Sequence, residues 1–169
     1  MNIEEIRNFI VYELFKHTGS LVIPQDNPKN KPPYPYLAYK ITSPYIPFEH
    51  QGNYSKELVP SQDEGFEYDI EETVELQPQM VMSINSYSDN LIESQELIKK
   101  TYDWFKHAGY YDLLDSNLVV VNIQAFGDRT LLIVDNYEYR QGFDVILRTT
   151  DTIKRRIETI EEYRIKEVK

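Results

Sequence analysis

The sequence predicts an α+β fold, a mostly antiparallel β-sheet with two main α-helices packed on it. Two segments, residues 2–18 and 88–106, place apolar residues at the three- and four-residue intervals of an amphipathic helix. Other apolar segments alternate with a period of two or are rich in valine and isoleucine, as strands are. The expected order is helix, strands, helix and then strands again, which makes an α+β domain.

The first element expected is a helix over residues 2–18. Asn2 can cap its start, with Glu5 three residues further on as in a capping box, and Gly19 suits its end. A short strand, residues 20–23, should follow. The apolar stripe of the helix consists of Ile3, Ile6, Ile10 and Leu14.

A proline-rich connector, residues 24–35, then leads into a strand over residues 36–42. Residues 43–65 are expected to be irregular, because prolines and a glycine interrupt them. Loops longer than about 15 residues are usually functional or disordered. We therefore expect a loop or arm at about 43–75 that orders against a neighbour. Its candidate contact residues are the aromatic side chains Tyr45, Phe48 and Tyr54.

The middle of the chain should contain two strands and the second helix. Residues 67–76 are acidic and extended, and residues 80–87 form the next strand. Ser88 and Asp89 are expected to cap a helix that runs to about Lys106, with Gly109 after it. A β-rich run at 118–125 and a turn at 127–130 complete this part.

The last strand, residues 137–148, alternates almost without interruption. One side carries Tyr137, Tyr139, Phe143, Val145 and Leu147. The other side carries the charged residues Glu138, Arg140, Asp144 and Arg148. This ionic side is either a solvated outer face or a surface on which something polar docks. For residues 151–169 the spacing fits a helix and a strand equally.

Length and composition indicate a single globular domain over residues 1–169, with 41% hydrophobic residues. The sequence has no apolar run of about 18 residues and no basic, apolar start, so neither a membrane span nor a signal peptide is expected. It has no cysteine, which rules out disulfides and thiolate chemistry. A net charge of −10 argues against ordinary binding of DNA or RNA.

The sequence offers no catalytic, cofactor-binding or metal-binding constellation. His17, His50 and His107 are far apart, whereas a zinc site needs three or four converging ligands. No glycine-rich phosphate loop and no nucleophile elbow occur. Acidic residues crowd one stretch without the pattern of a calcium loop, and such runs are usually solvated. They are Asp63, Glu64, Glu67, Asp69, Glu71, Glu72 and Glu75.

The order of five segments resembles that of the neck terminator proteins of tailed bacteriophages, a group similar to tail terminators. The segments are 18–24 (TGSLVIP), 35–41 (PYLAYKI), 77–84 (QPQMVMSI), 139–145 (YRQGFDV) and 157–160 (IETI). The resemblance covers nearly the whole chain and depends on the order and spacing of the segments. It implies a tail-terminator-like fold and no catalytic residues or cofactor.

The resemblance further implies a ring, typically hexameric, at the top of the tail. Such a ring ends assembly of the tail tube, joins the tail to the neck or connector proteins and lets DNA pass. The protein would be assembled in the cytoplasm of the bacterial host and remain in the virion. The acidic stretch would then line the channel and repel the phosphates of DNA. Two alternatives stay open, another neck or tail-completion component and a non-viral α+β adaptor domain.

Overall fold

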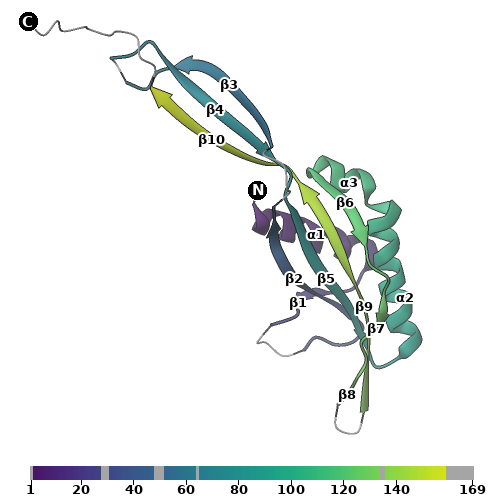
Figure 1. Ribbon diagram of the computed structural model, residues 1–169. Coiled ribbons are helices and arrows are strands. Elements are labelled where there is room, and N and C mark those ends of the chain that lie inside the picture. Colours follow the sequence, from purple (N-terminus) through teal and green to yellow (C-terminus); the bar gives the residue numbers. More distant parts are fainter. Residues whose placement is uncertain (1, 28–30, 48–51, 64, 134–135, 159–169) are drawn as a thin grey trace, which may run out of the picture. The chain divides into compact units, whose positions relative to one another are not determined.

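The computed structural model describes residues 2–27, 31–47, 52–63, 65–133 and 136–158, and it confirms the α+β fold (Figure 1). The chain divides into two compact units. The sheet–helix unit comprises Met1–Pro47 and Pro78–Thr150. The three-stranded unit comprises Phe48–Gln77 and Asp151–Lys169, and so contains much of the segment expected to form an arm.

The sheet–helix unit is built on one main sheet, with its strands in the order β1-β2-β5-β9-β6. Only β1 and β2 are parallel; the other neighbours are antiparallel. Two short strands, β7 (Gly127–Asp128) and β8 (Leu131–Ile133), also pair with β9. The five main strands are β1 (Val22–Pro24), β2 (Tyr36–Ile46), β5 (Gln79–Ser88), β9 (Asn136–Thr149) and β6 (Leu118–Ile123).

The helices of this unit are α1 (Ile3–Thr18), α2 (Leu91–Asp103) and the short α3 (Tyr110–Asp115). Asn2 caps α1 as expected, and its side-chain oxygen accepts hydrogen bonds from the backbone of Glu4 and Glu5. The N-cap of α2 is Asn90, not the predicted Ser88–Asp89 pair, because the Asn90 side chain reaches the backbone N–H groups of Ile92 and Glu93.

The second helix ends in a π-helical turn, Trp104–Ala108, before α3 begins. Gly109 lies between the two because the Trp104 indole occupies the space that a side chain would need; a Cβ there would lie 2.3 Å from the ring. The sequence predicts no helix after Gly109, yet α3 begins at Tyr110.

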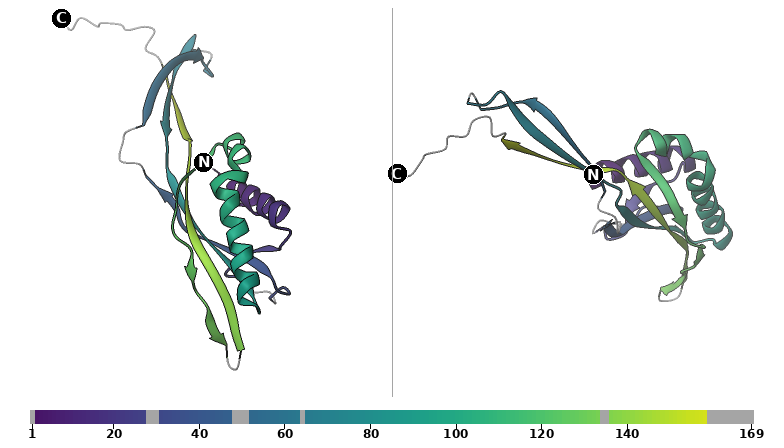
Figure 2. Two further views of the ribbon diagram at one scale, coloured as in Figure 1. Left: turned by 90° about the vertical axis from the view of Figure 1, so that its right-hand side faces the viewer. Right: turned by 45° about the horizontal axis from the view of Figure 1, so that its top comes forward.

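The helices lie on one side of the main sheet (Figure 2). The alternation of β9 is confirmed where the structure describes its side chains, since Phe143, Val145 and Leu147 are fully buried. They pack with the buried side of α1, including Ile10 and Leu14. Other members of this core are Leu37, Met80, Met82, Ile84, Ile98, Trp104 and Leu118.

The three-stranded unit is an antiparallel sheet in the order β10-β4-β3. Its strands are β3 (Asn53–Pro60), β4 (Tyr68–Leu76) and β10 (Asp151–Glu158). This resolves the ambiguity of the tail in favour of a strand as far as Glu158; residues 159–169 lie outside the described residues.

The expectation that residues 43–65 are irregular was wrong. Strand β2 continues through Pro44 to Ile46, and β3 runs to Pro60. Proline is tolerated at Pro44 because the pairing of β2 with β5 shifts register between Ser43 and Ile46, where no regular ladder bond is needed. The predicted turn at 127–130 likewise contains β7. None of the described helices is long and apolar enough to cross a membrane.

Candidate interaction surfaces

The side of the main sheet that faces away from the helices is polar. Asp144, Gly142 and Arg140 of β9 lie opposite Ser83, Asn85 and Tyr87 of β5. Since side chains alternate along a strand, these residues share one side with Glu138 and Arg148. We call it the polar side of the main sheet.

Arg129 ties the centre of this polar side together. Its Nη1 donates to Ser83 Oγ at 2.9 Å and to Asn85 Oδ1 at 2.8 Å, and its Nη2 lies 3.3 Å from Asp144 Oδ1. Asp144 is therefore paired within the chain. Gly142 leaves the space for this network, because a Cβ there would lie 2.2 Å from Asn85 Oδ1 and 2.9 Å from Arg129 Nη1.

Glu138 is buried on the same side, only 5% exposed, and is held by the proline-rich connector. Its Oε2 accepts hydrogen bonds from Lys31 Nζ and from the Tyr34 hydroxyl, both at 2.5 Å. Burial, and then the bond to Glu138, raises the pKa of Tyr34 above its ordinary value. The carboxylate expected on an outer face is thus satisfied by a segment more than a hundred residues away in sequence.

Arg140 belongs to an aromatic stack beside Glu138. Tyr34, Tyr36 and Tyr87 stack with ring centroids 5.7 and 4.9 Å apart, and the Arg140 guanidinium lies 5.2 Å from the Tyr87 centroid. Burial raises the pKa of Tyr36 to about 12. Arg140 Nε is buried and has no hydrogen-bond partner among the described residues. Arg148, between Gln79 and Val119 in the sheet, is half-buried.

The register of the three-stranded unit sorts its side chains into two different sides. On one side, which we call the apolar side, an ionic row lies between two apolar rows. The rows are Tyr54–Val74–Ile153, Lys56–Glu72–Arg155 and Leu58–Ile70–Ile157. The opposite, acidic side has the rows Asn53–Glu75–Thr152, Ser55–Thr73–Lys154 and Glu57–Glu71–Arg156.

Glu72 is the centre of the ionic row and is almost fully buried. Its carboxylate accepts hydrogen bonds from the Tyr54 hydroxyl and from Arg155 Nε, the latter at 2.5 Å, and Lys56 Nζ lies 2.9 Å away. The bonds from Tyr54, Lys56 and Arg155 lower the pKa of Glu72 to about 2. Tyr54, predicted as a partner contact, thus has a partner inside its own unit.

The other acidic residues fall into different environments. Glu71 lies 2.8 Å from Lys154 and 3.5 Å from Arg156, and its pKa is lowered mainly by the bond from Lys154. Asp69 is buried and accepts a bond from the Gln62 backbone at 3.4 Å. Glu75 is exposed on β4, and Asp63 and Glu67 lie between β3 and β4. Glu64 and Phe48 lie outside the described residues, and Tyr45 is exposed on β2.

Sequence reasoning missed the cations that neutralise this stretch. Lys154, Arg155 and Arg156 are more than 80 residues away from Glu71 and Glu72, and the helical alternative for 151–169 hid their role. A signal for the strand was available in the sequence, because Ile153, Arg155 and Ile157 recur at two-residue intervals, as residues on one side of a strand do. In the structure they lie opposite Val74, Glu72 and Ile70 of β4.

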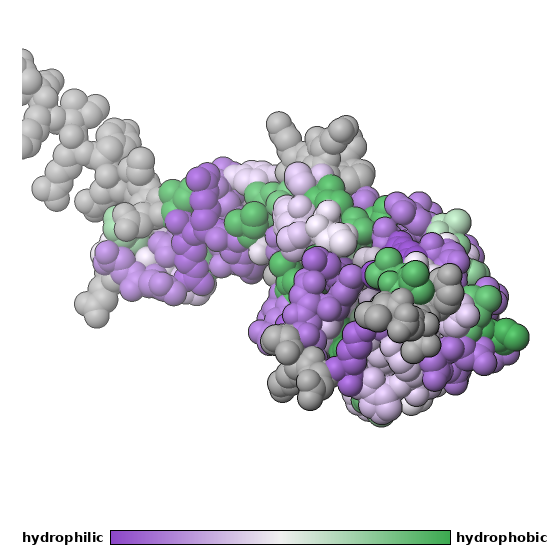
Figure 3. Space-filling model, turned by 90° about the horizontal axis from the view of Figure 1, so that it is seen from below, coloured by the Kyte–Doolittle hydropathy of each residue, from purple (hydrophilic) through white to green (hydrophobic). Residues whose placement is uncertain are grey.

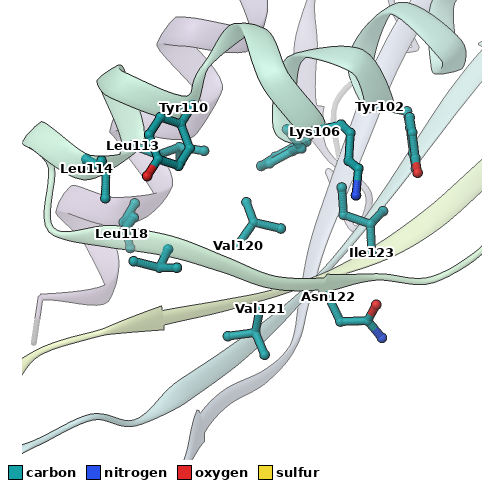
Figure 4. A pocket seen from close by; sticks show the side chains of 12 residues that line it. Tyr102, Lys106, Tyr110, Leu113, Leu114, Leu118, Val120, Val121, Asn122 and Ile123 are labelled. Atoms are coloured by element: carbon teal, nitrogen blue, oxygen red, sulfur yellow. The ribbon is translucent and has the colours of Figure 1, made fainter.

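A further surface is a hollow of about 370 Å³ between β6 and the helical segment that ends in α3 (Figure 4). Val120 and Ile123 point towards the helices, and Leu114 and Tyr110 line the opposite wall. Tyr110 and Leu114 are 54% and 41% exposed. Hydrophobic residues are also exposed elsewhere among hydrophilic ones (Figure 3). We call this hollow the α3–β6 groove.

The described residues contain no cluster of three or more histidine, aspartate and glutamate side chains that could hold a metal ion. A comparison with curated proteins finds no match. A family model described as phage neck terminator protein matches residues 4–169, which is nearly the whole chain.

Proposed function

The chain belongs to the phage neck terminator proteins, structural proteins of the bacteriophage virion, and on this basis we propose that it forms a ring at the top of the tail. The ring is a homohexamer that ends assembly of the tail tube and joins the tail to the neck or connector proteins. It is assembled in the cytoplasm of the bacterial host and has no catalytic role and no cofactor. The match over residues 4–169 is the observation that carries this proposal.

The surfaces of the chain support a ring. A closed ring needs contacts between two different patches of the same chain. The described residues offer at least three candidates: the polar side of the main sheet, the apolar side of the three-stranded unit and the α3–β6 groove. On the polar side, Arg148 is the charged β9 residue that we propose for a contact, because Glu138 and Asp144 already have partners.

We also propose that DNA passes through the ring without being bound in a sequence-specific manner. The net charge of −10 disfavours tight binding of phosphates. The proposed channel lining comprises Glu57, Glu71 and Glu75, which share the acidic side of the three-stranded unit, together with Asp63 and Glu67. Asp69 is left out because it is buried. Glu72 is left out of this lining, since it lies on the apolar side and is neutralised by Lys56 and Arg155.

Infection with a phage that lacks this gene tests the proposed function. We expect tails of uncontrolled length and DNA-filled heads that do not join to tails, and complementation with the wild-type gene should restore virions. Tails of normal length that still fail to join heads would favour another neck or tail-completion component. Normal infectious particles without the protein would refute both roles.

A further inference from the structure

The two outer strands of the three-stranded unit each have an open edge. In the described part of the chain, β3 and β10 pair with β4 alone. An open edge presents a row of unpaired backbone N–H and C=O groups that can pair with a further strand. Both strands have eight residues, and they run in the same direction because each is antiparallel to β4. In length and direction, β3 therefore suits β10 of an adjacent copy.

The other outer strands of the described residues suit β3 less well. Strands β1, β7 and β8 have three residues or fewer, and β1 ends in Pro24, which lacks a backbone N–H. Strand β6 has six residues, but its pairing with β9 shifts register between Val120 and Asn122, and it carries no charge. Strand β10 is the one of matching length.

Charge favours pairing of the two different edges over pairing of two identical ones. Strand β10 carries three consecutive cations, Lys154, Arg155 and Arg156, which are 57%, 72% and 41% exposed. Two β10 edges side by side would bring these cations together, which is repulsive. On β3, Glu57 is exposed and forms no ion pair with any described residue. It is a carboxylate on the edge that would meet the cationic strand.

We propose that the open edge of β3 in one copy pairs, in parallel, with the open edge of β10 in the next copy. Glu57 then lies beside Lys154 of the next copy. The three-stranded units of the ring join into one continuous sheet. The contact uses two different edges, as the contact of a closed ring must. This inference deepens the proposed function and rests on it, because it requires that the chain assembles into a ring.

The side chains on the apolar side support this register. Leu58, which is 68% exposed, lies beside Arg155 of the next copy, and Lys56 lies beside Ile153, which is 54% exposed. The hydrocarbon stems of the two cations thus cover exposed apolar side chains. Shifting the register by two residues, so that Glu57 meets Arg156, would place Lys56 beside Arg155, which is repulsive.

The continuous sheet also gives the acidic sides a common direction. Side chains alternate along each strand, so pairing in this register keeps all acidic sides on one side of the joined sheet. Glu57, Glu71 and Glu75 of every copy then face the same way, as the proposed channel lining requires.

Disulfide formation tests the contact, since the chain has no cysteine of its own. In the proposed register, Ser55 lies beside Thr152 of the next copy. Neighbouring strands are about 4.8 Å apart, which is within the Cα separation that a disulfide needs. Within one copy β4 separates the two residues, so they are at least about 9 Å apart.

Rings of the double variant Ser55→Cys with Thr152→Cys are assembled under reducing conditions, oxidised, and separated under denaturing conditions without reductant. We expect a ladder of covalent oligomers that ends at the full ring. The variant Asn53→Cys with Thr152→Cys is the matched control, because Asn53 and Ser55 are both exposed on the acidic side of β3. It should give no ladder, because Asn53 lies roughly 7 Å further along the strand.

Three results would overturn the proposal. A ladder from the Asn53 control with none from the Ser55 variant would refute the register and with it the contact between Glu57 and Lys154. Covalent dimers of Ser55→Cys alone would show that two identical β3 edges pair. Cross-links within one chain would show that the two thiols meet inside one copy.

Electron microscopy of the same samples separates failure of the contact from failure of the proposed function. Rings that are present without a ladder from either double variant would refute the contact and leave the ring intact. Absence of rings in both wild-type virions and purified protein would refute the proposed function, and the inference with it.

Discussion

At the scale of single residues, the hydrogen-bond network on the polar side of the main sheet requires a glycine at position 142. Gly142 and Gly127 lie opposite each other on β9 and β7, yet their surroundings differ. Arg129, Asn85 and the Ile84 backbone crowd Gly142, whereas nothing lies within 4 Å of a Cβ at Gly127. The sequence shows two isolated glycines and does not reveal that they differ. The difference arises because Arg129 and Asn85, which are distant in sequence, approach Gly142 in the fold.

We predict that Gly142→Ala destabilises the sheet–helix unit by about 1–3 kcal/mol, the usual cost of forcing an extra group into a packed site. Gly127→Ala is the matched control and should leave stability nearly unchanged. Thermal unfolding of both variants measures the difference. Equal melting temperatures would show that the Arg129 network adapts without cost.

Glu72 links all three strands of the three-stranded unit, because its carboxylate contacts Tyr54 and Lys56 on β3 and Arg155 on β10. Its folded pKa of about 2 lies below the ordinary value of 4.5, so the ionised form is favoured by folding. The contribution to stability is complete above pH 4.5 and is lost as the pH falls towards about 2. This follows from the hydrogen bonds that Tyr54, Lys56 and Arg155 donate to the carboxylate.

We therefore predict that the amide signals of β3, β4 and β10 shift or broaden in NMR spectra between pH 4.5 and about 2. Glu72→Gln, which keeps the shape of the side chain but has no charge to lose, should abolish the part of this change that surrounds Glu72. The part that surrounds Glu71, whose pKa is also lowered, should remain. Identical pH profiles for the wild type and the variant would contradict the role of Glu72.

At the scale of elements, the sequence predicted the helices and strands whose pattern of apolar and polar residues is contained within the element itself. The helix 2–18, the strand 80–87 and the ionic alternation of 137–148 all appear in the structure as α1, β5 and β9. Strand β3 was missed because its flanking prolines suggested a loop, while its pairing with β4 is a tertiary effect. Strand β10 stayed ambiguous because its partner lies more than 70 residues earlier in the chain.

The sequence predicted which residues of β9 share one side, but it did not predict which side chains elsewhere in the chain would pair with them. Alternation placed Glu138, Arg140, Asp144 and Arg148 on one side of β9, as observed. It gave no sign that Lys31, Tyr34 and Arg129 would pair with two of them. Partners that are distant in sequence are brought together by the fold, so one strand's pattern does not contain them.

The two arginines of β9 should consequently respond differently to charge reversal. Arg140→Glu removes the contact with Tyr87 and places a carboxylate beside buried Glu138, so it should lower the melting temperature. The lost cation–π contact alone is worth roughly 0.5–2 kcal/mol. Arg148→Glu should leave the fold intact and impair assembly, as judged by thermal unfolding and by counting joined particles. Normal assembly of Arg148→Glu would remove Arg148 from the proposed contact.

At the scale of the whole molecule, charge and function are linked by the proposed channel. The acidic side of the three-stranded unit carries Glu57, Glu71 and Glu75 on one side of the sheet. If this side faces passing DNA, its carboxylates repel the phosphates and keep transit fast. Lys154 and Arg156 offset part of this charge, so the effect of any one carboxylate should be small.

We predict that changing Glu57, Glu71 and Glu75 together to Gln leaves assembly intact and slows DNA ejection. The delay should shrink at high salt, because mobile ions screen the difference in charge. Ejection is followed by fluorescence of a DNA-binding dye, with a triple change of the uncharged Asn53, Ser55 and Thr73 to Ala as control. Unchanged ejection by assembled mutant particles would leave solubility as the reason for the charge.

The position of the protein in the virion distinguishes a terminator ring from the alternatives. Cryo-electron microscopy of intact particles, with the protein identified by fitting its sheet–helix unit, should show a single ring at the joint between tail and neck. Six copies around the DNA channel are expected. Copies distributed along the tail tube, or virions that lack the protein altogether, would refute the proposed ring.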